Sequence, residues 1–255
     1  MQIAGPLRLA VIAVVAALVG GNAFAAETNI AVAANFTDAA KEIAAAFKQK
    51  TGHQAVLSFG SSGQFYTQIT QDAPFQILLS ADDERPKKLV DDGLAVADSR
   101  FTYAIGKLVL WSKTTDFVKG AETLEAGAFS KLAIANPTAA PYGAAAVEAL
   151  KRLKLYETLQ PKIVQGNNIT QTFQFIETGN AELGFIALSQ LAGNPGGSLW
   201  VVPQILYAPI RQDAVLLKKG VGNEVAAAFL TFLKGPEARA IIVKYGYEPS
   251  GGGGS

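Results

Sequence analysis

Short, continuous apolar runs alternate with amphipathic stretches along most of this chain of 255 residues. The clearest runs lie at 29–34, 54–59, 75–81, 131–135 and 183–188. In the stretch after the first run, an apolar stripe at helical spacing is formed by Phe36, Ala40, Ile43 and Phe47. Strands that alternate with helices favour parallel sheets that are covered by helices on both faces. The sequence therefore predicts an α/β fold with mostly parallel sheets flanked by helices.

Two longer apolar runs divide the chain. They cover Thr102–Ser112 and Ile205–Leu217, and they bracket the middle third of the sequence. Runs of this length could cross from one sheet to another, which would produce two lobes joined by two crossover strands. We therefore predict a discontinuous first lobe from residues 26–104 and 212–250, and a second lobe from residues 105–211.

The first 25 residues have the pattern of a secretory signal peptide. Arg8 precedes the eleven apolar residues 9–19, and a small-x-small cleavage site follows at Ala23-Phe24-Ala25. Eleven residues are too few for a helix to cross a membrane, so we expect cleavage after Ala25 rather than a retained membrane anchor. The chain contains no cysteine, so we expect neither disulfides nor a lipid-modified cysteine. We predict a soluble, exported protein.

The composition narrows the classes of partner. The formal net charge is +1 and 17% of the residues are charged. A nucleic-acid-binding protein would favour a basic face, and binding to anionic lipid would favour a block of Lys and Arg. We therefore expect no nucleic-acid partner and no direct membrane insertion of the mature chain. The last five residues, 251–255, read GGGGS, which is typical of an engineered flexible linker.

Four joints between a predicted strand and a predicted helix are free of Lys, Arg, Asp, Glu and His. These joints are Ala33–Phe36, Gly60–Gly63, Asn136–Tyr142 and Gly166–Ile169. Such joints of a parallel sheet lie at the carboxyl edge of its strands, where the ligands of open α/β folds bind. We therefore expect these four loops to form a ligand site.

Uncharged loops that precede helices are suited to an anion. The first turn of a helix has unpaired N–H groups and a partial positive charge, and Asn or Ser side chains add further donors. A charge-assisted hydrogen bond contributes roughly 1.5–3 kcal/mol, so about six or seven donors could offset the desolvation of a dianion. Asn35, Ser62 and Asn168 could instead be ordinary helix N-caps, and the sequence leaves that alternative open.

Sequence signals for catalysis are weak. Ser61 and Ser62 do not fit the G-x-S-x-G pattern of serine hydrolases, and the loop Gly60–Gly63 lacks the lysine of a phosphate-binding P-loop. The sole histidine, His53, lies between a predicted helix and a predicted strand. We therefore predict that the chain is not an enzyme, and we keep a serine hydrolase that uses Ser62 as the alternative from another class.

Direct ligation of a metal cation is also disfavoured. One histidine and no cysteine leave few ligands for soft metals. The acidic residues at 82–84 are better explained as helix-capping and first-turn carboxylates than as a hard-metal site. Tyr66, Tyr103 and Tyr142 could suggest an iron site with tyrosinate ligands, but no charged ligand accompanies them in the loops. We expect no cofactor and no metal cation.

Six segments together resemble the periplasmic molybdate-binding proteins of ABC-type transporters. They are AVAANFTDAAKEIAAAF, LSFGSSGQFYTQI, FQILLSAD, RFTYAIGKLVLWS, NPTAAPYGAAAVEAL and FLKGPEARAIIVKYGY. The similarity extends from residue 29 to residue 247, and the motifs occur in the order of the family. The resemblance implies a periplasmic-binding-protein fold of type II, periplasmic localisation, and a tetrahedral molybdate or tungstate held between two lobes by neutral donors.

The resemblance also implies a set of ligand-binding residues. The ligand positions of the family fall on Asn35, Ser62, Tyr142 and Ile169, the last through its backbone N–H. Some relatives add a tyrosine hydroxyl from the strand at 183–188, where this chain has Ala187. The identity of a fifth contact is therefore left open.

The function implied by the resemblance is capture of molybdate or tungstate by a monomer that delivers the anion to a membrane permease and its ATPase. Molybdenum would be bound as an oxyanion rather than as a cation. A receptor for another tetrahedral oxyanion, such as sulfate or phosphate, is the alternative among binding proteins. A structural exported protein without a ligand is a third possibility.

Overall fold

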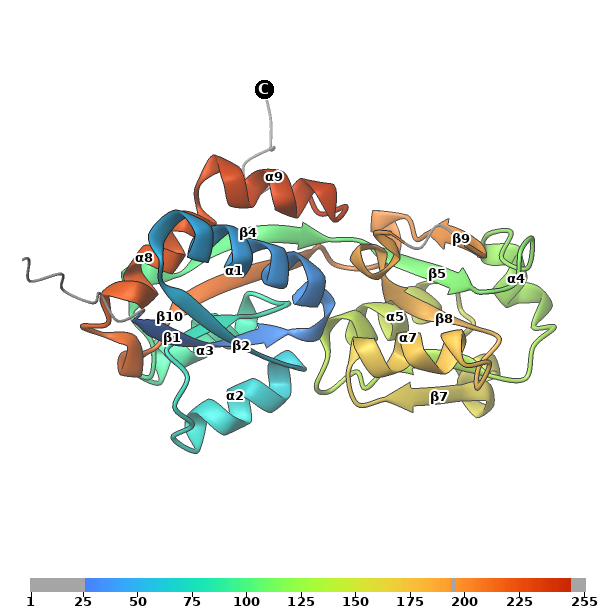
Figure 1. Cartoon of the computed structure of the whole chain (residues 1–255). Helices are drawn as coiled ribbons and strands as arrows, with labels where there is room; N and C mark the ends of the chain where they lie inside the picture. Colours follow the sequence, from blue (N-terminus) through green and yellow to red (C-terminus); the bar gives the residue numbers. More distant parts are fainter. Residues whose placement is uncertain (1–25, 194–195, 249–255) are drawn as a thin grey trace, which may run out of the picture.

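The computed structural model describes residues 26–193 and 196–248, which form two five-stranded sheets, each flanked by helices (Figure 1). We call the part built on the sheet that contains β1 lobe 1, and the part built on the other sheet lobe 2. This arrangement confirms the predicted α/β fold with two lobes joined by crossover strands. The predicted signal peptide at 1–25 and the linker at 251–255 lie outside the described residues.

The sheet of lobe 1 has the strand order β2-β1-β3-β10-β4. Its strands are β1 (Glu27–Ala33), β2 (Gln54–Gly60), β3 (Ile77–Leu79), β4 (Phe101–Gly106) and β10 (Ile210–Leu216). β1 is parallel to β2 and β3, and Ala33 is paired with Gly60 where β1 and β2 end. The loops that follow these strands therefore leave the sheet at the same edge.

The sheet of lobe 2 has the strand order β7-β6-β8-β5-β9. Its strands are β5 (Leu108–Ser112), β6 (Leu132–Ala135), β7 (Ile163–Gly166), β8 (Leu183–Ala187) and β9 (Ser198–Val201). β6 is parallel to β7 and β8, whereas β5 is antiparallel to both β8 and β9. As in lobe 1, three neighbouring parallel strands end at one edge.

Both sheets are more mixed than the sequence suggested, because two of the four strand pairings in each sheet are antiparallel. The crossovers explain this difference. β4 leaves lobe 1 and continues after Lys107 as β5 in lobe 2, while β10 returns into the sheet of lobe 1 between β3 and β4. β10 enters lobe 1 from lobe 2 and is antiparallel to β3, and β5 enters lobe 2 from lobe 1 and is antiparallel to β8. The parallel strands of each lobe therefore end at the edge that faces the other lobe.

The exact lobe boundaries stay a prediction. The predicted boundary at 104/105 falls within β4, and the boundary at 211/212 falls within β10. The apolar run at 205–217 starts as a 3-10 turn (Gln204–Leu206), and its strand begins only at Ile210. Pro209 lacks the N–H that a strand ladder needs, which accounts for the late start.

The longer helices follow the amphipathic stretches of the sequence. In chain order, the helices are α1 (Thr37–Thr51), α2 (Ser62–Thr70), α3 (Glu84–Asp91), α4 (Ala121–Ala126), α5 (Pro141–Arg152), α6 (Tyr156–Leu159), α7 (Ile169–Glu177), α8 (Glu224–Leu233) and α9 (Pro236–Lys244). The predicted stripe of α1 is buried, and the ring of Phe47 packs edge-on against Phe229 of α8 at 5.3 Å. α1 ends at Gly52, whose φ of 74° suits glycine. Within 26–193 and 196–248, none of the helices has the length and hydropathy to cross a membrane.

Candidate functional site

The four uncharged joints meet between the lobes around one small cavity. The residues that line it are Ala33, Ala34, Asn35, Gly60, Ser61, Ser62, Ala81, Ala140, Pro141, Tyr142, Asn168 and Ile169. Every one of these described residues is uncharged. The structure thus brings together all four residues that the resemblance assigns to the ligand, namely Asn35, Ser62, Tyr142 and Ile169. Their role as ligand contacts stays a prediction.

Ser62 lies in the first turn of α2, and its neighbour Ser61 caps the helix. Ser61 Oγ accepts a hydrogen bond from Gln64 N at 3.4 Å, and Gln64 Oε1 accepts one from Ser61 N at 3.3 Å; together they form a capping box. The Oγ of the buried Ser62 accepts a hydrogen bond from Ala81 N at 2.9 Å. The N-cap interpretation is therefore wrong for Ser62. Its hydroxyl proton and its backbone N–H, which has no acceptor within the helix, are available to the cavity.

Asn168 and Ile169 begin α7. Asn168 is the N-cap, because its Oδ1 accepts a hydrogen bond from Gln171 N at 3.0 Å. Ile169 is the first helical residue, so its N–H has no acceptor within the helix. Gln190 holds this segment in place: its Nε2 donates to Ile169 O at 3.1 Å and its Oε1 accepts from Ala187 N at 3.0 Å. Ala187 itself carries only a methyl group and cannot supply the further hydroxyl.

Tyr142 lies one residue inside the start of α5. Pro141 precedes it at the first helical position, where no N–H is needed. The hydroxyl oxygen of the buried Tyr142 accepts a hydrogen bond from Gln212 Nε2 at 3.2 Å, so its own proton is available to the cavity. The next residue is Gly143, where a Cβ would lie 2.1 Å from the carbonyl oxygen of Ala135. Glycine therefore lets α5 start this close to β6.

Asn35 lies in a 3-10 turn, Ala34–Phe36, and its side chain bonds to the protein. Its Nδ2 donates to Gln212 Oε1 and to the hydroxyl of Tyr247, both at 2.9 Å. The backbone carbonyl oxygen of Asn35 accepts hydrogen bonds from Ser189 Oγ at 2.9 Å and from the hydroxyl of Tyr247 at 2.7 Å. The N-cap interpretation is therefore wrong for Asn35 as well. Because both side-chain N–H groups are used inside the protein, a donor from Asn35 to a ligand has to come from its backbone.

A buried network behind the cavity contains polar residues that the sequence did not place there: Tyr103, Ser189, Gln212 and Tyr247. Gln212 is fully buried, and its Oε1 accepts from Tyr103 at 3.1 Å in addition to Asn35. The signal that could have identified Tyr103 and Gln212 is that both are polar residues inside the long apolar runs at 102–112 and 205–217. Ser189 and Tyr247 carry no comparable local signal.

The tyrosines of this network are neutral hydrogen-bond donors. Burial raises the pKa of Tyr103, Tyr142 and Tyr247 well above the ordinary value, because a phenolate would lose its hydration there. Tyr66 lies apart from them on α2, where its hydroxyl donates to Asp92 at 3.1 Å. The three tyrosines suggested as iron ligands therefore do not gather at one place, because only Tyr103 and Tyr142 bond to Gln212.

Hydrogen bonds join the two lobes around the cavity. Gly63 N donates to Ala139 O at 2.9 Å, and the guanidinium of Arg85 donates to Thr138 O at 2.8 Å. A Cβ at Gly63 would lie 2.9 Å from the backbone of Ala139, so the glycine permits this close contact. The lobes are therefore closed on each other, and groups from both of them border the cavity.

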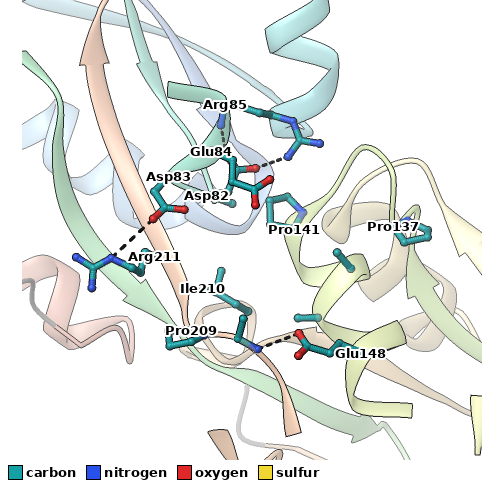
Figure 2. A pocket seen from close by; sticks show the side chains of 14 residues that line it. Asp82, Asp83, Glu84, Arg85, Pro137, Pro141, Glu148, Pro209, Ile210 and Arg211 are labelled. Atoms are coloured by element: carbon teal, nitrogen blue, oxygen red, sulfur yellow. Dashed lines mark hydrogen bonds and ion pairs between the residues drawn. The ribbon is translucent and has the colours of Figure 1, made fainter. Parts of the chain in front are cut away.

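A second, larger cavity lies beside the first and shares Ala81 and Pro141 with it (Figure 2). Five of the charged residues that line it make the contacts drawn in Figure 2: Asp82 with Arg85, Asp83 with Arg211 at 3.9 Å, and Glu148 with the N–H of Ala208 at 2.9 Å.

The carboxylates at 82–84 border this second cavity. Asp82 Oδ1 accepts a hydrogen bond from Arg85 N at 3.0 Å, and Glu84 lies in the first turn of α3. The capping and first-turn interpretation therefore holds for Asp82 and Glu84, whereas Asp83, the N-cap residue, makes no side-chain capping bond. Among the described residues, no group of three or more His, Asp or Glu side chains is placed to hold a metal ion.

The geometry does not support a serine hydrolase. His53 precedes β2 and Ser62 follows it. A strand of this length separates its ends by roughly 20 Å, so the sole histidine cannot act as a base for Ser62. The hydroxyl of Ser62 bonds instead to the backbone of Ala81.

Comparisons with known proteins agree with this architecture. Residues 28–248 match the family model described as "Bacterial extracellular solute-binding protein". The molybdate-binding protein ModA of Rhodobacter capsulatus is 57% identical over 225 residues, which cover 88% of this chain and 89% of that protein. ModA of Azotobacter vinelandii is 53% identical over 242 residues, which cover 93% of this chain and 96% of that protein.

The same relationship appears in three dimensions. The solved structure of the periplasmic molybdate-binding protein of Azotobacter vinelandii superposes with a TM-score of 0.84 and 40% identity, over 87% of this chain and 98% of that chain. These likenesses span both lobes and all four loops that line the cavity. The chain therefore belongs to the bacterial extracellular solute-binding proteins, in the branch of the molybdate-binding proteins ModA.

Proposed function

We propose that this protein binds molybdate or tungstate in the periplasm and delivers the anion to the permease and ATPase of an ABC-type transporter. The observation that carries the proposal is the cavity between the lobes, which is lined by uncharged residues from four strand-to-helix joints. Close relatives that are named molybdate-binding proteins support this choice of ligand. The protein acts as a monomer, without catalysis and without a cofactor.

The donor set of the cavity suits an anion that carries no proton. Ser62 and Tyr142 each accept a hydrogen bond from the protein and keep a hydroxyl proton for the ligand. The N–H groups of Ser62 and Ile169 lie at helix amino ends, where the helix dipole favours negative charge. Phosphate at neutral pH keeps a proton that needs an acceptor, so this set of donors disfavours it. Sulfate carries no proton and is the alternative ligand, which the size of the anion would distinguish.

Closure of the lobes would favour the bound state. The hydrogen bonds from Gly63 to Ala139 and from Arg85 to Thr138 exist only when the lobes are together. An anion held by donors from both lobes shifts the population toward the closed form by its differential affinity. The closed form is then the species that the permease recognises.

The test is isothermal titration of the purified, ligand-stripped protein with molybdate, tungstate, sulfate and phosphate. We expect tight binding of molybdate and tungstate, weaker binding of sulfate and the weakest binding of phosphate. Ser62→Ala should weaken molybdate binding about tenfold or more, because one charge-assisted hydrogen bond is lost. A protein that responds to neither molybdate nor tungstate would refute the proposal, and a preference for sulfate would establish the alternative.

A further inference from the structure

Gln212 connects the crossover to predicted ligand residues of both lobes. It lies on β10, which returns from lobe 2 to lobe 1, and it is fully buried. Its Oε1 accepts from Asn35 Nδ2 of lobe 1 at 2.9 Å, and its Nε2 donates to the hydroxyl of Tyr142 of lobe 2 at 3.2 Å. Gln212 does not itself line the cavity within the described residues. Any effect on a ligand is therefore exerted through Asn35 and Tyr142.

The backbone around Gln212 is shaped for these contacts. The pairing of β10 with β4 shifts its register between Gln212 and Asp213, and irregularities of this kind redirect a side chain next to a functional site. On β4, a Cβ at Gly106 would lie 2.0 Å from the hydroxyl of Tyr142 and 2.7 Å from Gln212 Nε2. The hydrogen bond between Gln212 and Tyr142 therefore occupies space that only a glycine at position 106 leaves open.

The direction of this hydrogen bond decides what Tyr142 offers to the cavity. A tyrosine hydroxyl has a single proton. Because Gln212 donates to the Tyr142 oxygen, that proton is left for the ligand. A carboxylate at position 212 could only accept a hydrogen bond. The hydroxyl of Tyr142 would then donate its proton to that carboxylate, and an oxygen lone pair of Tyr142 would face the anion.

We propose that Gln212 is a positioning residue that sets the hydrogen-bond direction of Tyr142, and thereby makes the cavity select a fully deprotonated oxyanion. This inference rests on the proposed function. On this proposal, the side-chain amide of Gln212, which lies outside the cavity, is responsible for the preference for molybdate over hydrogen phosphate.

The experiment is a double-mutant cycle of Gln212→Met and Tyr142→Phe, with molybdate affinity and the ratio of molybdate to phosphate affinity as readouts. In the wild-type background, Gln212→Met should weaken molybdate binding about tenfold and lower the ratio, because the proton of Tyr142 is no longer directed. In the Tyr142→Phe background, the same substitution should change the affinity by only about twofold, because the two residues act as a unit. Tyr103→Phe is the matched control: it removes another hydrogen bond to Gln212, and it should lower the melting temperature without changing the ratio.

Gln212→Glu provides an independent variant. Its molybdate affinity should fall as the pH rises, because a protonated carboxyl can donate to Tyr142 and a carboxylate cannot. The uncharged groups that face this position are Asn35, Tyr103, Tyr142 and Tyr247. The nearby acids are engaged elsewhere, Asp213 with Arg100 and Asp82 with Arg85, so the introduced carboxyl dominates the profile. The wild-type affinity should be flat from pH 6 to 9.

The outcomes separate the inference from the proposed function. Equal losses of molybdate affinity from Gln212→Met in both backgrounds, or a flat pH profile of the affinity for Gln212→Glu, would overturn the inference. The proposed function would still stand if the wild-type protein binds molybdate. A wild-type protein that does not bind molybdate would overturn both.

Discussion

Replacing Tyr142 with phenylalanine tests the role of a neutral donor directly. The substitution removes one hydroxyl and keeps the ring, which is buried at the start of α5. A hydrogen bond to a charged group contributes roughly 1.5–3 kcal/mol, so the dissociation constant for molybdate should rise about 10- to 150-fold. The N–H of Gln212 also loses its acceptor. An unsatisfied buried donor costs about 1–3 kcal/mol, so the melting temperature should fall by on the order of 5 °C.

Tyr207→Phe is the matched control. The hydroxyl of Tyr207 is buried in lobe 2, where it accepts a hydrogen bond from Leu108 N at 3.1 Å, and Tyr207 does not belong to the lining of the cavity. Its removal should cost similar stability and leave the affinity unchanged. Calorimetric titration and thermal unfolding of both variants at one pH and salt concentration separate the two effects. An unchanged molybdate affinity in Tyr142→Phe, or an equal loss in both variants, would refute this account of the site.

Two further predictions concern pH and packing. Burial raises the pKa of Tyr103, Tyr142 and Tyr247 above the value of about 10 for an unfolded tyrosine. Above that pH, the folded chain therefore keeps protons that the unfolded chain releases. The free energy of unfolding should be unaffected below about pH 10 and should fall above it. Circular dichroism during alkaline titration measures this, and a loss centred near neutral pH would contradict it. Gly106→Ala should destabilise the protein by about 1–3 kcal/mol, because its Cβ would overlap the hydroxyl of Tyr142. Urea unfolding tests this, and stability equal to that of the wild type would show that β4 and the start of α5 can move apart.

The elements that could be predicted are those with a strong local pattern. The stripe of α1 and its glycine stop at Gly52 required no knowledge of the rest of the chain. The short elements α4, α6 and β9 have four to six residues each, which is too few for a hydrophobic period to be recognised. The antiparallel pairings also escaped prediction, because strand direction depends on how the crossovers connect the lobes.

The candidate site divides in the same way. The absence of charge from four loops is visible in the sequence, and it indicated an anion before any geometry was known. Which serine caps α2 was not visible. Ser61 and Ser62 are chemically identical neighbours, and only the position of the first helical turn makes Ser61 the cap and leaves Ser62 to the cavity.

The alternation of strands and helices, and the chemistry of the loops between them, can be inferred from sequence because both are local properties of the chain. Which groups complete the buried network depends instead on how the chain folds. Asn35 bonds to Gln212 and Tyr247, which are 177 and 212 residues away along the chain. Contacts over such distances follow from the sheet order and the return of β10 between the lobes, and a local pattern carries no information about either.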